Sequence, residues 1–171
     1  MAVLNILTYP DKFLAQPTVP VTEVTEELKK FVEDMADTMY QAPGIGLAAN
    51  QVGSDKRLLI ADPAPDPEKR EFRVFINPEI VSMEGEVISE EEGCLSVPDY
   101  RADVKRAERV VVRYLDLDLK PATLETGGML AIILQHEIDH LNGILFIDRL
   151  SALKKQMYKR RVKKLMKFDE A

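Results

Sequence analysis

Apolar residues recur at helical spacing in the first quarter of the chain. Thr25, a residue type that favours helix N-caps, is followed by Glu26 and Glu27, and Pro43 with Gly44 ends the segment. Between these limits, five apolar residues fall within about 100° of arc on a helical projection: Leu28, Phe31, Val32, Met35 and Met39. The pattern predicts an amphipathic helix with one face in the core.

The middle of the chain changes to short apolar runs and alternation. Residues 57–61 are typical of a buried strand, residues 62–71 of a solvated loop, and residues 72–118 alternate at the period of a β-strand. Residues 8–21 contain three prolines and predict an extended loop. Several short strands between two helical segments predict an α+β fold with a mixed or antiparallel sheet.

A second helix is expected from a different pattern, since residues 129–134 are apolar on every face and so predict a buried helix. Thr126 with Gly127 and Gly128 marks its start, and Asn142 with Gly143 marks its end. At 171 residues and 46% hydrophobic, the chain can bury one core. We therefore expect a single domain over residues 1–171, with short strands around this central helix.

The end of the central helix carries the sequence H-E-x-x-H. His136 and His140, the only two histidines of the chain, lie one helical turn apart, so both rings can reach one metal ion. Glu137 lies about 100° further round the helix, where it can touch a water held by the metal. A metal-activated water beside a carboxylate is the arrangement of a hydrolase. The alternative is a pair of core or solvated histidines on an ordinary helix.

A catalytic site needs a third ligand. No further histidine exists, so this ligand is Cys94, the only cysteine, or a carboxylate. A structural zinc site is closed by four Cys or His ligands, and the chain has three such residues. A Cys/His/His set would leave one position open and would therefore be catalytic. Read alone, Cys94 is equally typical of a small buried hydrophobe.

Residues 44–53 match the dinucleotide fingerprint G-x-G-x-x-A, but an amphipathic helix precedes them where that fingerprint requires a strand. Glycines here more simply allow close approach of the backbone to a ligand or a neighbouring element. Met129, Ile132 and Ile133 share the helical face of the two histidines. This face predicts an apolar wall beside the metal, with core packing as the alternative.

Three blocks together resemble the signature motifs of the peptide deformylase family. They are Gly44-Ile45-Gly46-Leu47-Ala48-Ala49-Asn50-Gln51, Glu92-Gly93-Cys94-Leu95-Ser96 and Gln135-His136-Glu137-Ile138-Asp139-His140. They occur in that family's order and at similar separations, and the resemblance extends over nearly the whole chain. It implies removal of the formyl group from the N-terminal formyl-methionine of nascent polypeptides.

The resemblance also implies residue roles. Cys94, His136 and His140 would hold one divalent metal ion, ferrous iron first and nickel, cobalt or zinc as alternatives. Glu137 would be the general base and acid, with the Gln51 amide and the Leu95 N–H as oxyanion donors. The methionine side chain would enter an apolar wall, and two glycines near the metal would leave room for the formyl group and the backbone; these six residues are Ile45, Gly46, Gly93, Met129, Ile132 and Ile133.

The last part of the chain differs in charge from the rest. Between Lys154 and Lys167 there are eight Lys or Arg and no acid, whereas the whole chain has a net charge of −6. Helix propensities predict a basic C-terminal helix over residues 150–168. This helix is either solvated on an acidic body or docks on an anionic partner, which for this family would be the ribosome.

Two rival functions remain from the residues alone. An H-E-x-x-H zinc peptidase would need a downstream ligand, for which Asp148, Asp169 and Glu170 are the acids present. A non-enzymatic, ribosome-associated metal-binding module would need a fourth ligand. One cysteine excludes an intrachain disulfide, and no segment resembles a leader or a membrane span, which favours the cytoplasm. Neither a membrane nor a specific nucleic-acid sequence is an expected partner.

Overall fold

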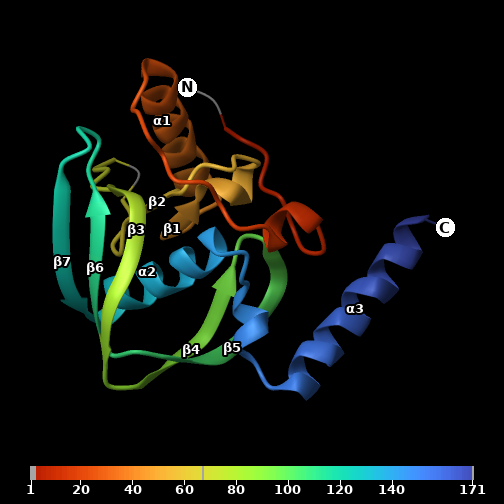
Figure 1. Cartoon of the computed structure of the whole chain (residues 1–171). Helices are drawn as coiled ribbons and strands as arrows, with labels where there is room; N and C mark the ends of the chain where they lie inside the picture. Colours follow the sequence, from red (N-terminus) through yellow and green to blue (C-terminus); the bar gives the residue numbers. More distant parts are fainter. Residues whose placement is uncertain (1–2, 67, 171) are drawn as a thin grey trace.

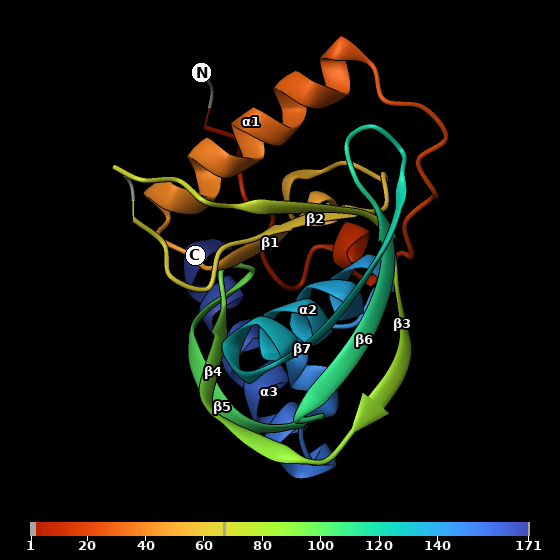
Figure 2. The same ribbon diagram turned by 90° about the vertical axis from the view of Figure 1, so that its left-hand side faces the viewer.

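The computed structural model describes residues 3–66 and 68–170, with side chains as far as Met166. Its elements form two antiparallel sheets with a helix between them (Figures 1 and 2). No helix of this described part is long and apolar enough to cross a membrane.

The larger sheet has five strands in the order β1-β2-β3-β6-β7, and every neighbouring pair is antiparallel. The smaller sheet pairs β4 with β5. The strand bounds are β1 Gly46–Ala48, β2 Leu58–Ala61, β3 Arg73–Glu84, β4 Val87–Cys94, β5 Val97–Arg106, β6 Arg109–Leu115 and β7 Pro121–Gly127. The α+β prediction is confirmed, in its antiparallel form.

Two local predictions differ from the structure. Strand β7 lies beyond residue 118, where strands were expected to end, and its alternation is weak because its better-covered residues are only partly buried. The proline-containing segment at 8–21 includes a 3-10 turn, η1 (Lys12–Ala15), that starts where the Asp11 carboxylate accepts a hydrogen bond from the Phe13 N–H at 2.9 Å. An aspartate side chain that accepts a hydrogen bond from the N–H two residues later forms a local turn. The number of prolines in the segment gives no sign of this turn.

The first helix, α1 (Glu26–Gln41), begins as predicted. The Thr25 hydroxyl accepts a hydrogen bond from the Leu28 N–H at 3.1 Å and caps it. Its apolar face packs on one side of the large sheet, in a cluster that includes Met35, Leu47 and Ile60. Helix α1 therefore covers the far side of the strands that border the site.

The central helix, α2 (Gly128–Leu141), lies between the two sheets and packs on the other face of the large sheet (Figure 2). It ends at Asn142, and Gly143 follows with a φ of 79°. A Cβ at Gly143 would lie 2.5 Å from the Ala15 carbonyl oxygen. The residue that follows the end of α2 must therefore be glycine, both because a side chain would clash and because its φ is positive.

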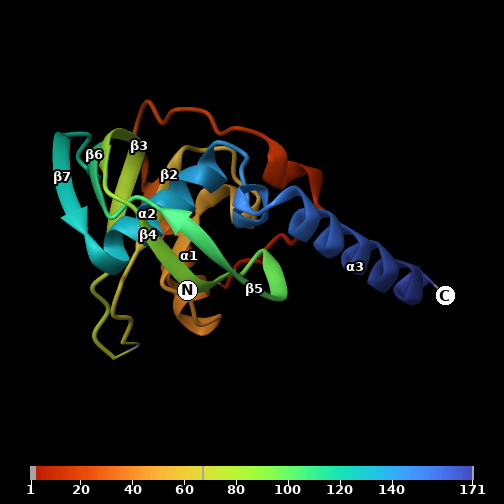
Figure 3. The same cartoon turned by 90° about the horizontal axis from the view of Figure 1, so that it is seen from below.

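A third apolar cluster lies under β4 and β5. It joins them to η1, to the 3-10 turn η3 (Phe146–Arg149) and to the start of the last helix, α3 (Ala152–Glu170). The predicted C-terminal helix is thus present, shifted by two residues. Beyond its first turns α3 extends away from the body (Figures 1 and 3).

Candidate active site

Cys94, His136 and His140 meet at the centre of the molecule. Their ligand atoms all lie within 4.8 Å of one another, and Cys94 Sγ is 3.1 Å from His140 Nε2. Helix α2 supplies both histidines on one buried face, and β4 ends at Cys94. Among the described residues no carboxylate joins the cluster, which favours Cys94 over a carboxylate as the third ligand.

The protein groups around these three residues fit a bound metal ion. Glu137 is 3% exposed, and its Oε2 atom is buried without a hydrogen-bond partner in the described part of the chain. Its Oε1 atom lies 3.5 Å from His136 Nε2. A buried carboxylate oxygen without a protein partner indicates a missing water or ion. A thiolate with two imidazoles is a donor set that suits iron or zinc.

Burial and neighbouring charges together shift the pKa values of the site. Burial raises the pKa of Glu137 to about 7, as expected for a carboxylate that can accept and return a proton near neutrality. It lowers the pKa of His140 well below its ordinary value. Burial also lowers the pKa of His136, but the Cys94 thiol and the Glu92 carboxylate raise it by more, to well above its ordinary value.

A buried ionic network supports His136 from behind. His136 Nδ1 lies 2.6 Å from Glu92 Oε1, and Glu92 accepts hydrogen bonds from the Arg106 guanidinium. Arg106 also donates to Asp139 at 2.9 Å, and Arg149 donates to both Asp139 oxygens at 2.7 and 3.1 Å. The network fixes the ring of His136 so that Nε2 faces the cluster.

The carboxylates of this network are each in direct contact with a positively charged or hydrogen-bonding partner. Burial raises the pKa of Glu92, but hydrogen bonds from His136 and Arg106 lower it by more, to about 2. Sequence reasoning assigned no role to these supporting residues. Glu92 and Asp139 lie inside the quoted motif blocks, which was the available signal; Arg106 and Arg149 lie far from the ligands in sequence and gave none.

The short helix η2 (Ala49–Val52) brings the polar pair of the first block to the site. The Gln51 amide donates to Ser96 Oγ at 3.1 Å and approaches Cys94 Sγ at 3.7 Å, while its oxygen accepts from the Ala48 N–H. Asn50 donates to the His140 carbonyl at 2.6 Å. Both side chains are 1% exposed, so the amide of Gln51 is held in a fixed orientation.

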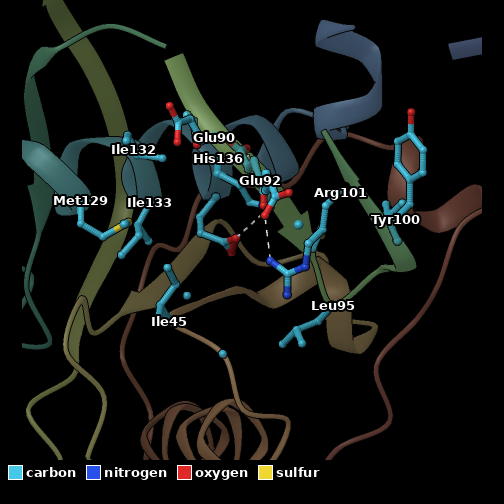
Figure 4. A pocket seen from close by; sticks show the side chains of 18 of the residues that line it. Ile45, Glu90, Glu92, Leu95, Tyr100, Arg101, Met129, Ile132, Ile133 and His136 are labelled. Carbon is cyan, nitrogen blue, oxygen red and sulfur yellow. Dashed lines mark hydrogen bonds and ion pairs between the residues drawn. The ribbon is translucent and has the colours of Figure 1, made fainter. Parts of the chain in front are cut away.

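A cavity of about 840 Å³ opens beside the cluster. Its lining contains every residue predicted for the pocket and for the oxyanion donors, together with His136, Glu137 and Cys94 (Figure 4). Ile133 is 3% exposed and Met129 is 51% exposed, so Ile133 forms the base of the wall and Met129 its mouth. The apolar face of α2 is thus both core and cavity wall.

Two of the three glycines in the lining, Gly46 and Gly93, are those predicted for the pocket, and both allow close packing. A Cβ at Gly46 would lie 2.8 Å from Ile133 Cγ2 and 3.1 Å from Glu137 Cγ. Strand β1 can therefore approach α2 this closely only because residue 46 is a glycine. A Cβ at Gly93 would lie 3.2 Å from Arg101 Nη1. Gly46 thus brings a strand edge against the helix that carries Glu137.

The outer lining is charged and was not predicted. It contains Glu90, Glu91, Asp99 and Arg101, and Tyr100 lies beside them on β5. The Arg101 guanidinium donates to the Glu91 carbonyl at 3.3 Å. Exposed residues at a cavity mouth carry no periodic signal, which is why the sequence pattern missed them.

Known proteins resemble this chain over nearly its whole length. The sequence profile of the polypeptide deformylase family matches residues 3–156. A peptide deformylase of Desulfosudis oleivorans is 51% identical over 167 residues, which cover 98% of this chain and 96% of that protein. The crystal structure of a peptide deformylase from Legionella pneumophila is 46% identical and has a TM-score of 0.87, with 99% of this chain and 98% of that chain covered.

A second solved structure carries a peptide. It is the class I type b peptide deformylase of Acinetobacter baumannii with Met-Ala-Ser bound, which is 37% identical with a TM-score of 0.82. The match covers 87% of this chain and 99% of that chain.

Proposed function

Since the chain belongs to the peptide deformylase family and is an enzyme of that family, we propose that it hydrolyses the N-terminal formyl group of formyl-methionyl nascent polypeptides, with Cys94, His136 and His140 as ligands of one divalent metal ion. Ferrous iron is our first choice, with nickel, cobalt and zinc as alternatives that suit the same donors. When bound, the ion supplies an acidified water and polarises the formyl carbonyl.

Glu137 is the proton carrier of the proposed reaction. Its buried carboxylate accepts a proton from the attacking water as the oxygen bonds to the formyl carbon. When the carbon–nitrogen bond breaks, Glu137 returns that proton to the amine nitrogen, and formate leaves. A pKa of about 7 supports both transfers, because the group is then neither too strong nor too weak an acid near neutral pH.

Gln51 and Leu95 stabilise the charge that develops on the formyl oxygen. The Gln51 amide nitrogen lies on the Cys94 side of the cavity, 3.7 Å from Sγ, and Leu95 follows Cys94 in the connection between β4 and β5. Donors held in place before the reaction need no reorganisation, and the loss of one typically costs about 2.7–4 kcal/mol of barrier. The hydrogen bond from the Ala48 N–H to the Gln51 oxygen keeps the amide turned this way.

The apolar wall of Ile45, Met129, Ile132 and Ile133 would receive the methionine side chain. Burial of such a side chain contributes about 1.5–3 kcal/mol. Met-Ala-Ser in the Acinetobacter baumannii relative supports a methionyl peptide as the ligand of this cavity.

The observation that carries the proposal is the cluster of one thiol and two imidazoles beside a buried carboxylate, one of whose oxygens has no partner among the described residues. Three ligands leave a position for substrate, which disfavours a purely structural metal module. The described acid downstream of the motif, Asp148, pairs with Lys155 at 2.6 Å and does not join the cluster, which disfavours the zinc peptidase.

The direct test is formate release from formyl-Met-Ala-Ser by anaerobically purified protein, with acetyl-Met-Ala-Ser and free Met-Ala-Ser as comparison substrates. We expect formate from the first peptide and no cleavage of the other two. Glu137→Gln keeps the shape of the side chain and removes the proton acceptor, so it should lower turnover by about 10²- to 10⁴-fold while metal content stays the same. Cleavage of free Met-Ala-Ser would instead indicate a peptidase.

We also propose that the reaction takes place in the cytoplasm, on chains leaving the ribosome, and that α3 assists there. Its described part from Lys154 to Lys164 carries seven basic residues and no acid, which favours an anionic surface such as ribosomal RNA.

A further inference from the structure

The polar residue that precedes Gln51 has no part in the proposed reaction, yet it is buried. Asn50 lies on η2 and is 1% exposed. A buried amide costs free energy unless hydrogen bonds compensate it. An apolar side chain would fill the same space without that cost, and the neighbouring Ala48 and Ala49 are buried in this way. The amide group of Asn50 therefore indicates a specific contact.

That contact is with a proposed metal ligand. The Asn50 side-chain nitrogen donates a hydrogen bond to the His140 carbonyl oxygen at 2.6 Å. This carbonyl lies in the last turn of α2, where carbonyls lack partners within the helix. The Gly143 N–H also donates to it, at 2.9 Å, but that bond stays within the turn that follows α2. The bond from Asn50 instead joins α2 to an element 90 residues away in sequence.

The element that carries Asn50 also carries the proposed oxyanion donor. Gln51 follows Asn50 directly, and its amide nitrogen lies 3.7 Å from Cys94 Sγ. Helix η2 has only four residues, so a displacement of Asn50 would displace Gln51 as well. Within the described part of the chain, the bond from Asn50 is the only hydrogen bond between η2 and α2.

The two proposed histidine ligands are held in different ways. The His136 ring is held at Nδ1 by Glu92 at 2.6 Å, as is usual for histidines that bind a metal. The His140 Nδ1 atom is buried and has no hydrogen-bond partner among the described residues. The hold on His140 therefore passes through its backbone, where Asn50 binds.

We propose that Asn50 is a positioning residue: it ties the backbone of His140 to η2 and so fixes this metal ligand relative to the oxyanion donor Gln51. The inference rests on the proposed function, in which the metal ion and Gln51 act on the same formyl group. Asn50 is not among the residues that line the cavity, so its effect passes through its two neighbours.

Thr18 provides a matched control at the same helix end. Its hydroxyl donates to the carbonyl oxygen of Leu141, the residue after His140, at 2.8 Å, and its N–H donates to the same oxygen at 2.9 Å. Thr18 lies before α1 and not on η2. Thr18→Val and Asn50→Leu each remove one side-chain hydrogen bond to the end of α2 and keep the shape of the side chain. Only the second bond leads to Gln51.

The experiment compares full-length wild type, Asn50→Leu and Thr18→Val in formate release from formyl-Met-Ala-Ser. For Asn50→Leu we expect kcat to fall about ten-fold with KM within about two-fold of wild type, because the oxyanion donor and the metal ion act mainly in the transition state. Thr18→Val should keep both constants within about two-fold of wild type.

A spectroscopic measurement separates positioning from plain stability. The visible absorption bands of bound cobalt report the geometry of its ligands. They should shift in cobalt-loaded Asn50→Leu and match wild type in cobalt-loaded Thr18→Val. Competition with a chelator should show about ten-fold weaker metal binding in Asn50→Leu alone.

The outcomes are distinct. Wild-type kcat and cobalt bands in Asn50→Leu, or equal losses in Asn50→Leu and Thr18→Val, overturn the positioning role. Should Asn50→Leu fail to fold, Asn50→Ala removes the same donor with a smaller side chain and is judged by the same criteria. A wild type that releases no formate overturns the proposed function instead, and the cobalt bands then still test the link from Asn50 to His140.

Discussion

Helices α2 and α3 follow each other along the chain, but they relate to the body in opposite ways. From Ala131 to Leu141 all residues of α2 except Ile132 are buried. Its polar side chains are held by β4, β5, η3 and the connection between β5 and β6. Helix α3 is exposed over most of its described length and enters the core through Tyr158. Buried polar groups are therefore concentrated around the proposed site and not along α3. A buried carboxylate costs free energy unless a hydrogen bond, an opposite charge or an ion compensates it, so this concentration points to the region where chemistry is expected.

Removing the buried support of α2 should have the largest effect of the substitutions below. Glu92→Gln keeps the size of the side chain but removes the charge that orients His136 and pairs with Arg106. We expect metal affinity to fall about 10- to 100-fold, as for other partners of metal-ligating histidines. Competition with a chelator measures this.

The matched control for that variant is Arg149→Ala, at the exposed end of the same network. Arg149 contacts Asp139 and is joined to His136 only through Asp139, Arg106 and Glu92. Its loss should change metal affinity by less than half an order of magnitude, on the scale of an exposed ion pair. Equal losses in both variants would show that the network acts on overall stability and not on the ring of His136.

A buried polar contact outside the site should affect stability without affecting metal. The Tyr40 hydroxyl donates to the Asp62 carboxylate and ties α1 to the loop after β2, and the Arg70 guanidinium lies 4.9 Å from the Tyr40 ring. Tyr40→Phe leaves a buried acceptor unpaired and should cost about 1–3 kcal/mol of unfolding free energy. Denaturant unfolding at pH 7 measures the loss, and chelator competition should show unchanged metal affinity.

The same contact predicts a pH dependence. Burial and the hydrogen bond to Asp62 raise the pKa of Tyr40 from 10.0 to about 12. The unfolded chain therefore loses this proton before the folded protein does, so the stabilisation is complete below pH 10 and disappears as the pH rises towards 12. The difference between wild type and Tyr40→Phe should shrink over that range; a constant difference would contradict the shifted pKa.

Changing the exposed side of α3 should have the smallest effect on turnover. Lys163→Glu with Lys164→Glu reverses two exposed charges beyond the buried Tyr158. Release of formate from small peptides should stay within about two-fold of wild type, while co-sedimentation with ribosomes at low salt should fall. Unchanged co-sedimentation would favour a solvated helix with no anionic partner.

What could be predicted from the sequence follows the same division. The site of α2 was predictable because the two proposed histidine ligands and the proposed proton carrier lie within five consecutive residues, with the histidines one helical turn apart. Gln51 and Cys94 followed from short motifs. The placement of Arg106 and Arg149, and the burial of Tyr158 in a helix without a clean apolar stripe, depend on contacts between residues far apart in sequence. No local pattern records such contacts.

The fold shows a similar limit. The N-cap of α1 and the glycine after α2 were predicted from residue types, because local backbone chemistry decides those positions. Strand β7 was missed because it faces the core with Ala122, Leu124 and Thr126, which are small or only partly covered. A partly buried outer strand gives too little contrast between its two faces for alternation to reveal it.

The claim on which everything else depends is that Cys94 from β4 and the two histidines from α2 hold one metal ion. The most direct measurement is cobalt substitution of metal-free wild type and Cys94→Ser, followed by metal analysis and visible absorption. We predict one cobalt per chain and a thiolate-to-cobalt charge-transfer band in wild type, and loss of that band with weakened binding in Cys94→Ser. Identical stoichiometry and spectra for the two proteins would contradict the claim.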